Sequence, residues 1–241
     1  MAFTKTVSDF WLERFPTTDD ALFKDANTTI TITPSLIKYR LMRLNSIDGY
    51  TKIAVAPELA NNLQLESTTV TSTEALWQKL EQANLSLHGA DQLYYFPEAE
   101  KGHILNETTP DHVRQLTKDD ETLFAQFTAS ASAADLDDAF VELDHWVVFG
   151  VFEGKTLVTA ASMFPWQDSK LADIGVITLA SARGKGYARS VVRAMSKHAY
   201  REGYEPQYRC ALDNKASAAV ARSSGLVTFG TWDVLLKPKE Q

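Results

Sequence analysis

The sequence has very little cysteine, since Cys210 is the only one among 241 residues. A single cysteine allows no internal disulfide and no Cys-x-x-Cys pair for a metal or redox site. We therefore expect a reducing compartment and no bound metal. Cys210 lies in a predicted strand, where a lone cysteine typically behaves as a small buried apolar residue rather than as a nucleophile.

Long apolar runs are also missing. The first residues, MAFTKTVSDF, lack the apolar stretch of a secretory signal. No run approaches the roughly 18 apolar residues that a bilayer-spanning helix needs. These absences predict a cytoplasmic protein without a membrane partner.

Positive charge is not in excess. Lys and Arg number 24 against 31 Asp and Glu, which gives a formal net charge of −7. Nucleic-acid binding normally appears as a basic surface, so the composition gives it no support. An anionic ligand would have to be held locally, by backbone amides and a few placed cations. The acidic balance is compatible with a cationic acceptor, and nothing in the sequence indicates an oligomeric state.

Core-forming residues, by contrast, are plentiful. Apolar residues make up 44% of the chain, which suffices for one large domain or two small ones. A polar stretch at 97–112, punctuated by Pro97, Gly102 and Pro110, predicts a linker or a long surface loop. We therefore predict a smaller mixed α/β domain over residues 1–108 and a second domain over residues 109–241.

The first domain alternates between helical and strand patterns. Residues 9–15 predict a short helix that ends before Pro16. A capping box at 71–74 predicts an amphipathic helix with Leu76 and Leu80 on its apolar face. Strands are predicted at 28–33, 39–44, 50–55 and 92–96, of which the middle two form a hairpin.

The second domain alternates more regularly, which predicts an α/β fold with a mixed sheet. Helices are predicted at 119–128 and 136–143, then from the glycine-rich turn to residue 202, and at 215–224. Strands are predicted at 113–116, 146–152, 156–163, 172–179, 207–212 and 227–236.

A glycine-rich turn follows the predicted strand 172–179 and opens a helix. Gly184 and Gly186 permit positive φ and leave room for a ligand close to the backbone. The first amides of the helix have no intrahelical acceptor, and together with the helix dipole they favour an anion. Arg183, Lys185 and Arg189 add positive charge.

Two common phosphate-binding patterns do not match this turn. Leu179 and Gly186 stand where a P-loop needs a glycine and a Ser or Thr, respectively. Arg189 stands where the dinucleotide fingerprint needs its third glycine. A plain strand-to-helix turn is the alternative, but the strand, the helix and the cations together favour a ligand site.

The turn resembles the R/Q-x-x-G-x-G/A motif of the GNAT superfamily of N-acetyltransferases. The matching residues are Arg183, Gly184, Lys185, Gly186, Tyr187 and Ala188. A second stretch, from Asn214 and Ser217 to Gly225-Leu226, is similar to the family's second motif, and residues 230–232 fit its last strand pair. The resemblance covers roughly the C-terminal half and implies a GNAT-like acyl-CoA N-acyltransferase fold there.

The resemblance implies acetyl-CoA as co-substrate, with its pantetheine arm in a gap between two splayed strands. The backbone of Ile177, Thr178 and Leu179 would pair with the arm, and Thr178 would polarise the thioester carbonyl. The amides from Gly184 to Ala188 would hold the pyrophosphate. Asn214 and Ser217 would contact the cofactor from the other side.

The implied chemistry is direct attack of a primary amine on the thioester, which needs a base. Asp173, on the central strand, is the candidate base. Glu142, Asp144 and His145 lie where the family's acceptor pocket is expected. Many family members carry a Tyr as general acid at the position of Ala221, so that role is unfilled here.

The leading hypothesis is acetyl transfer to a small-molecule amine, and three alternatives stay open. In the first alternative, the acceptor is a protein N-terminus or lysine. In the second, the chain is a CoA-binding regulatory protein without catalysis. In the third, the chain is an unrelated α/β domain that binds a nucleotide through the same turn. Residues 1–108 are interpreted as a degenerate second GNAT-like copy, a substrate cap or an interaction module. They contain no phosphate-binding turn, so we expect no second cofactor site.

Overall fold

The computed structural model describes residues 2–16, 21–36 and 38–236, and the chain passes more than once between two compact units. Unit 1 comprises Met1–Val7, Tyr94–Arg209 and Asn214–Val227, and unit 2 comprises Ser8–Leu93, Cys210–Asp213 and Thr228–Gln241. The division predicted between residues 108 and 109 falls inside unit 1 and stays a prediction about domains. No helix of the described ranges is both long and apolar enough to cross a membrane.

The sheet of unit 1 mixes parallel and antiparallel strands, which confirms the predicted mixed α/β class. Its strands lie in the order β10, β9, β8, β7 and β6. β10 runs parallel to β9, and the other neighbours are antiparallel. The bounds are β6 (Val113–Gln115), β7 (Val147–Glu153), β8 (Thr156–Pro165), β9 (Leu171–Thr178) and β10 (Glu205–Ala211).

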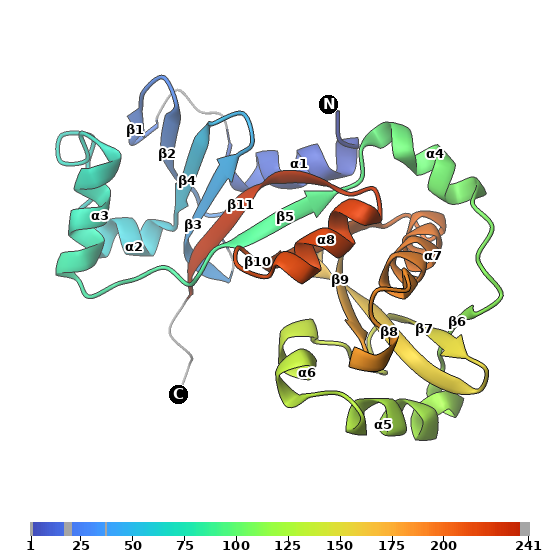
Figure 1. Cartoon of the computed structure of the whole chain (residues 1–241). Helices are drawn as coiled ribbons and strands as arrows, with labels where there is room; N and C mark the ends of the chain where they lie inside the picture. The colour runs from blue at the N-terminus through green and yellow to red at the C-terminus, as the bar shows by residue number, and fades with distance from the viewer. Residues whose placement is uncertain (1, 17–20, 37, 237–241) are drawn as a thin grey trace. The chain divides into compact units, whose positions relative to one another are not determined.

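Helices cover both faces of this sheet (Figure 1). The short helices α5 and α6 lie on one face, and α7 lies on the other. α7 turns Val191, Met195 and Ala199 inward at the predicted four-residue spacing, and all three are fully buried. The helices are α4 (Glu98–Asn106), α5 (Glu121–Ala129), α6 (Ala133–Ala139), α7 (Tyr187–Arg201) and α8 (Lys215–Ser223).

The strands of unit 2 lie in the order β1, β2, β4, β3 and β11. The predicted hairpin is confirmed, because β3 and β4 pair antiparallel with Leu41 opposite Val55. Apolar residues of α2 and α3 pack on these strands and close a separate core. The bounds are β1 (Phe23–Lys24), β2 (Thr28–Ile32), β3 (Tyr39–Ser46), β4 (Thr51–Val55), α2 (Pro57–Asn62), α3 (Thr73–Gln82) and β11 (Val227–Leu236). The division of the chain into units falls within helix α1 (Lys5–Arg14) and within strand β5 (Asp91–Tyr95).

The predicted linker at 97–112 is wrong, because α4 occupies most of it. Pro97 is the N-cap residue, and acidic residues fill the first turn, where they favour the helix dipole. Ile104 is the only residue that the helix buries fully. The segment therefore lacks the apolar stripe that marks an amphipathic helix, and its polarity resembles that of a loop.

Three predicted helix boundaries also differ. α3 is capped by Ser72, whose hydroxyl accepts from the Ala75 amide, so the box expected from 71 to 74 starts one residue late. α6 begins at Ala133 and ends before Phe140, whose φ of 46° stops the helix. The helix expected from residue 9 starts at Lys5. The shifts of α3 and α6 reflect local capping, which apolar spacing alone does not specify.

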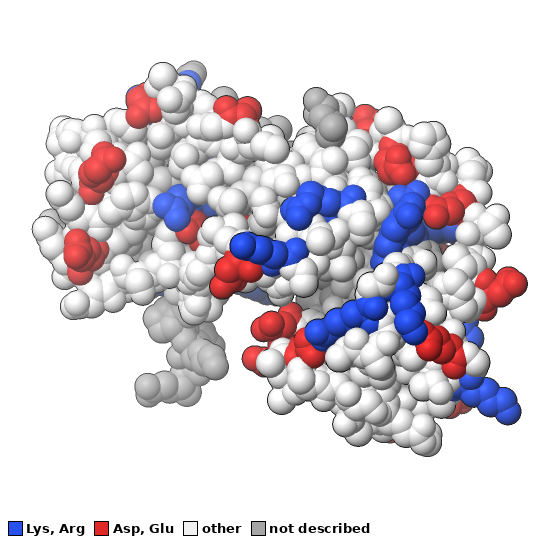
Figure 2. Space-filling model, viewed as in Figure 1, with Lys and Arg blue, Asp and Glu red and all other residues white. Residues whose placement is uncertain are grey.

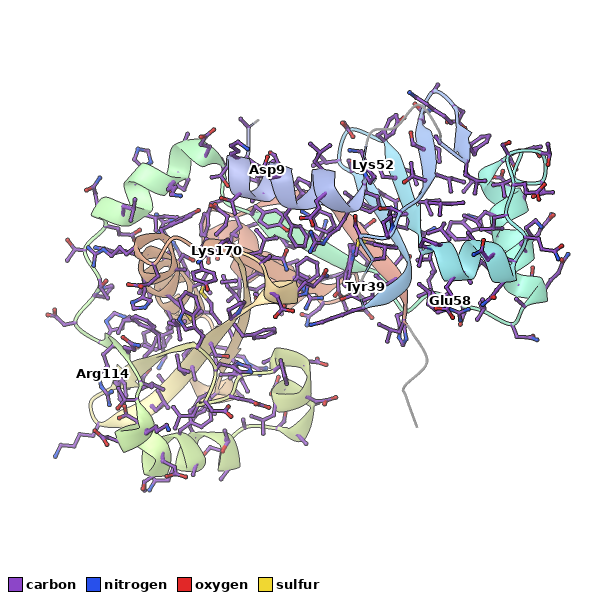
Figure 3. All side chains as sticks on the ribbon, turned by 180° about the vertical axis from the view of Figure 1, so that it is seen from behind. Asp9, Tyr39, Lys52, Glu58, Arg114 and Lys170 are labelled. Atoms are coloured by element: carbon purple, nitrogen blue, oxygen red, sulfur yellow. The ribbon has the colours of Figure 1, made fainter. Side chains whose placement is uncertain are left out.

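An ion pair fastens the edge strand of unit 1 to the helix face. Arg114 of β6, which is labelled in Figure 3, donates to both carboxylate oxygens of Asp120, at 2.6 and 2.9 Å. Asp120 also accepts from the Thr117 amide just before α5. The hydrogen bonds from Arg114 are the main cause that lowers the pKa of Asp120, which keeps the carboxylate charged.

Gly175 in β9 allows the end of α6 to lie directly on the sheet. A Cβ atom at this position would stand 2.1 Å from the carbonyl oxygen of Ala139 and 3.1 Å from that of Phe140. Since backbone atoms cannot yield as a flexible side chain can, we expect Gly175→Ala to destabilise unit 1 by about 1–3 kcal/mol.

Urea unfolding measures this effect, and Gly102→Ala is the matched control. Gly102 lies in α4, where an added Cβ meets nothing within 4 Å. Alanine there should stabilise the helix by about 0.5–1 kcal/mol. Equal unfolding free energies for wild type and Gly175→Ala would contradict the close approach.

Candidate functional site

Strands β9 and β10 of unit 1 are paired over only about half of their length. β9 and β10 are in register from Leu171 opposite Glu205 as far as Ile174 opposite Tyr208. Beyond that point β9 continues to Thr178, paired only with β8. A gap therefore opens between β9 and β10 at the carboxyl end of β9.

Strand geometry determines which peptide groups of β9 face this gap. The Leu179 amide donates to the Val158 carbonyl at 3.0 Å, and Thr159 stands opposite Thr178. In an antiparallel pair, hydrogen-bonded residues alternate with residues whose peptide groups point away. Val176 and Thr178 therefore present their peptide groups to the gap, whereas Ile177 and Leu179 use theirs on β8.

This placement refines the three backbone positions predicted from the sequence. Of Ile177, Thr178 and Leu179, only Thr178 turns its peptide group toward the gap, and its carbonyl accepts from Arg183 Nε at 3.1 Å. Val176 was missed. The two-residue period of a strand, counted from Thr178, could have identified it.

The glycine-rich turn lies at the open end of the gap. Gly184 and Gly186 have φ of 78° and 81°, a region that favours glycine, and an added Cβ at either would meet nothing within 4 Å. α7 starts immediately after Gly186. Within the described part of the chain, the first three amides of α7, at 187–189, have no protein acceptor. The turn thus has free donors and empty space in the same place.

Lys and Arg side chains gather over α7 and the turn before it (Figure 2). Two of the cations at the turn are neutralised: Arg183 pairs with Asp135 at 2.8 Å, and Lys185 pairs with Glu153 at 2.6 Å. The hydrogen bond from Lys185 is the largest cause that lowers the pKa of Glu153. Arg189 has no ion-pair partner among the residues that the structure describes, and it lies beside the turn.

The opposite wall comes from α8 and β10. Asn214 caps α8 by accepting from the Ser217 amide at 3.0 Å. The Ser217 hydroxyl is 2.8 Å from the hydroxyl of Tyr208, which sequence reasoning missed. Ala221, at the position that the resemblance assigns to a general acid, is fully buried.

These features form one groove of about 510 Å³ that reaches from the turn to α6. Of the predicted cofactor residues, it is lined by Ile177, Thr178, Arg183, Gly184, Gly186, Tyr187, Ala188, Asn214 and Ser217. Lys185 lines a neighbouring cavity of about 310 Å³ between α4 and α7, and Leu179 lines neither.

The candidate base, Asp173, lies at the closed end of the gap and is 5% exposed. Arg209 donates to both of its carboxylate oxygens, at 2.6 and 3.1 Å. Gln207, which is fully buried, donates to Oδ1 at 3.1 Å. These bonds occupy both carboxylate oxygens of Asp173. Its role as base stays a prediction.

The predicted acceptor residues lie on the α6 face of the sheet. His145 Nδ1 is 2.8 Å from the hydroxyl of Ser162, and Nε2 is 3.7 Å from a carboxylate oxygen of Glu142. The rings of Phe140 and Phe164 lie 5.0 and 4.9 Å from the His145 ring. Burial lowers the pKa of His145, against the opposing effect of the Glu142 and Asp144 charges, so the imidazole is neutral at pH 7.

The described residues offer no candidate metal centre. Across residues 2–16, 21–36 and 38–236, no three His, Cys, Asp or Glu side chains cluster so that they could hold a metal ion. The groove is lined by backbone donors, hydroxyls and Arg189, and His145 is not among its lining residues.

A family model described as an acetyltransferase (GNAT) domain matches residues 104–227, just over half of the chain. A GNAT-family acetyltransferase structure from Colwellia psychrerythraea is 18% identical over 79% of each chain, with a TM-score of 0.51. A GCN5-related N-acetyltransferase from Kribbella flavida is 18% identical over 68% of this chain and 64% of its own, with a TM-score of 0.46. No curated protein matches.

The ion pair between Arg209 and Asp173 should be essential for stability. Arg209→Met removes the charge and leaves a buried carboxylate without its cation, which we expect to destabilise the protein by about 3 kcal/mol in urea unfolding. Arg222→Met, on the exposed side of α8, is the control and should change stability by less than about 0.5 kcal/mol.

A second variant separates charge from packing. Asp173→Asn combined with Arg209→Met removes both charges and should recover part of the loss. If Arg209→Met were no less stable than the control variant, the pair would not hold the closed end of the gap.

Proposed function

This chain belongs to the GNAT acetyltransferase family, and on that premise we propose that it transfers the acetyl group of acetyl-CoA to a primary amine of a small molecule. The family typically uses acetyl-CoA as co-substrate. The observation that carries the proposal is the gap between β9 and β10, which opens directly onto the glycine-rich turn within one groove.

The residues along this groove suit the parts of acetyl-CoA. The peptide groups of Val176 and Thr178 would pair with the pantetheine amides, as an added strand pairs with a sheet edge. The amides at 184–188 and the free guanidinium of Arg189 would hold the pyrophosphate. Acetyl-CoA supplies an acyl group activated as a thioester.

Room for a pyrophosphate supports this assignment. A Cβ at Gly184 or Gly186 would point into empty space. The groove of about 510 Å³ has the volume of a typical small-molecule site. Asn214 and Ser217 lie on the opposite wall, as the resemblance implies, although their side chains also bond within the protein.

The acceptor would enter from the α6 side, near His145. The His145 side chain is 12% exposed and is enclosed by Phe140 and Phe164. Such confinement favours a small amine over a lysine on a folded protein. Glu142 and Asp144 would attract the ammonium form, and the neutral imidazole can accept a hydrogen bond from the amine.

Acetyl-CoA should stabilise the protein against heat, because a ligand that binds only the folded state shifts the unfolding equilibrium. At a hundredfold excess over its dissociation constant the gain is about 2.7 kcal/mol. Thermal melts with acetyl-CoA, ATP and NAD measure it. A rise with acetyl-CoA alone supports the proposal, and a rise with ATP alone would point to the nucleotide-binding alternative and overturn it.

Gly186→Val tests the pyrophosphate site directly. The new side chain would occupy the space in front of the α7 amides, so we expect affinity for acetyl-CoA to fall by about 10-fold or more in calorimetry, a change of about 1.4 kcal/mol.

Gly203→Val is the matched control for backbone strain. Gly203 has φ of 76°, and an added Cβ also meets nothing within 4 Å, but it lies at the other end of α7. Both variants should lose some stability, and only Gly186→Val should lose affinity. Equal affinity in a folded Gly186→Val protein would remove the turn from the binding site.

A further inference from the structure

Tyr208 occupies the point where β9 and β10 separate. It is the last residue of β10 in register with β9, opposite Ile174. The side chain is 2% exposed, yet it lines the groove. Its ring stands edge-on to Tyr94, with centroids 6.3 Å apart, and this contact fixes the ring plane.

The Tyr208 hydroxyl forms a pair with the hydroxyl of Ser217. The two oxygens are 2.8 Å apart, and Ser217 lies in the first turn of α8, where its amide is held by Asn214. Two hydroxyls that share a hydrogen bond can pass a proton from one oxygen to the other. The pair therefore unites a proton donor with a route by which the proton can be replaced.

Other hydroxyls along the groove are engaged elsewhere. Thr178 Oγ1 accepts from Thr159 at 3.0 Å. The Tyr187 hydroxyl bonds to Glu153, and the Ser223 hydroxyl donates to the Val220 carbonyl at 3.0 Å. Ala221 carries no polar group. Tyr208 and Ser217 are thus the hydroxyls that lie together where β9 and β10 separate.

We propose that Tyr208, held by Ser217, is the acid that protonates the leaving thiolate in the acetyl transfer. The inference rests on the proposed function, since it assigns a role in that reaction. Tyr208, on β10, would thus take the general-acid role that is unfilled at Ala221, on α8.

The step balances as follows. The amine nitrogen forms a bond to the acyl carbon, the C–S bond breaks, and its electron pair goes to sulfur. The Tyr208 O–H gives its proton to the sulfur. The proton that the amine nitrogen loses passes to solvent, and Ser217 relays a solvent proton back to the Tyr208 oxygen. A tyrosine hydroxyl, with an ordinary pKa of about 10, is protonated at neutral pH and ready to donate.

Tyr208→Phe removes the hydroxyl and keeps the ring. Thiol release from acetyl-CoA is followed with putrescine, tryptamine, kanamycin and a lysine peptide as probe amines, and the fastest is used for the comparison. We expect kcat to fall about 100-fold, while the dissociation constant for acetyl-CoA and the melting temperature stay close to wild type. We also expect kcat of the wild type to decline at alkaline pH and this decline to be absent in Tyr208→Phe.

Two further variants sharpen the test. Ser217→Ala removes the relay and should lower kcat by less than Tyr208→Phe. Tyr204→Phe removes a hydroxyl that lies outside the groove and should leave kcat and its pH profile unchanged.

Three results would overturn the inference, and they are distinguishable. Wild-type kcat and pH profile in Tyr208→Phe would dismiss Tyr208 as the acid while the proposed function stands. A rise in the dissociation constant for acetyl-CoA that accounts for the whole rate loss would make Tyr208 a binding residue. If the wild type binds acetyl-CoA but releases no thiol with any probe amine, the proposed transfer itself fails.

Discussion

The end of strand pairing between β9 and β10 is the constraint on which the site depends. A strand within a sheet normally satisfies its peptide groups on both sides. β9 does so against β8 from Ala172 to Thr178, but against β10 only as far as Ile174. Beyond Ile174, alternate peptide groups lack a strand partner, and the sheet acquires an internal edge. An internal edge is a binding surface, because any ligand with amide groups can complete it.

Such a gap needs a fixed closed end, and buried polar contacts provide it. Asp173 of β9 is joined across the strands to Gln207 and Arg209 of β10. Burying an ion pair stabilises a fold only when geometry is good and other hydrogen bonds complete it. Here both carboxylate oxygens are bonded, so the pair fixes the register of the two strands. The same bonds hold β9 and β10 together at the closed end of the gap.

The sequence predicts the elements of unit 1 well, because each is marked by its own period or punctuation. The strands around Val151, Ala161 and Ile174 have apolar, β-branched patterns, and Gly184 and Gly186 mark the turn. α4 was missed because its apolar face amounts to Ile104 alone. A local apolar pattern cannot reveal a helix that is stabilised by packing on another helix, as α4 is by packing on α7.

The site was predictable where function resides in a contiguous motif, and not where it depends on strands that meet in space. The turn at 183–188 could be identified from its glycines. Tyr208 could not, because its position at the apex depends on the register with Ile174, and register is a tertiary property. The alternation that selects Val176 over Ile177 likewise follows from pairing with β8.

The turn carries less unpaired positive charge than the sequence implies. Arg183, Lys185 and Arg189 look like three equal contributors, yet Asp135 and Glu153 neutralise the first two. What remains for an anion is a set of backbone amides and the guanidinium of Arg189. Amides positioned by a helix start lose little entropy on binding, whereas a surface lysine must be immobilised. A chain with a net charge of −7 therefore does not need an extended basic surface to hold a pyrophosphate. It needs glycines at the turn, because their lack of a side chain leaves the backbone amides accessible to the ligand.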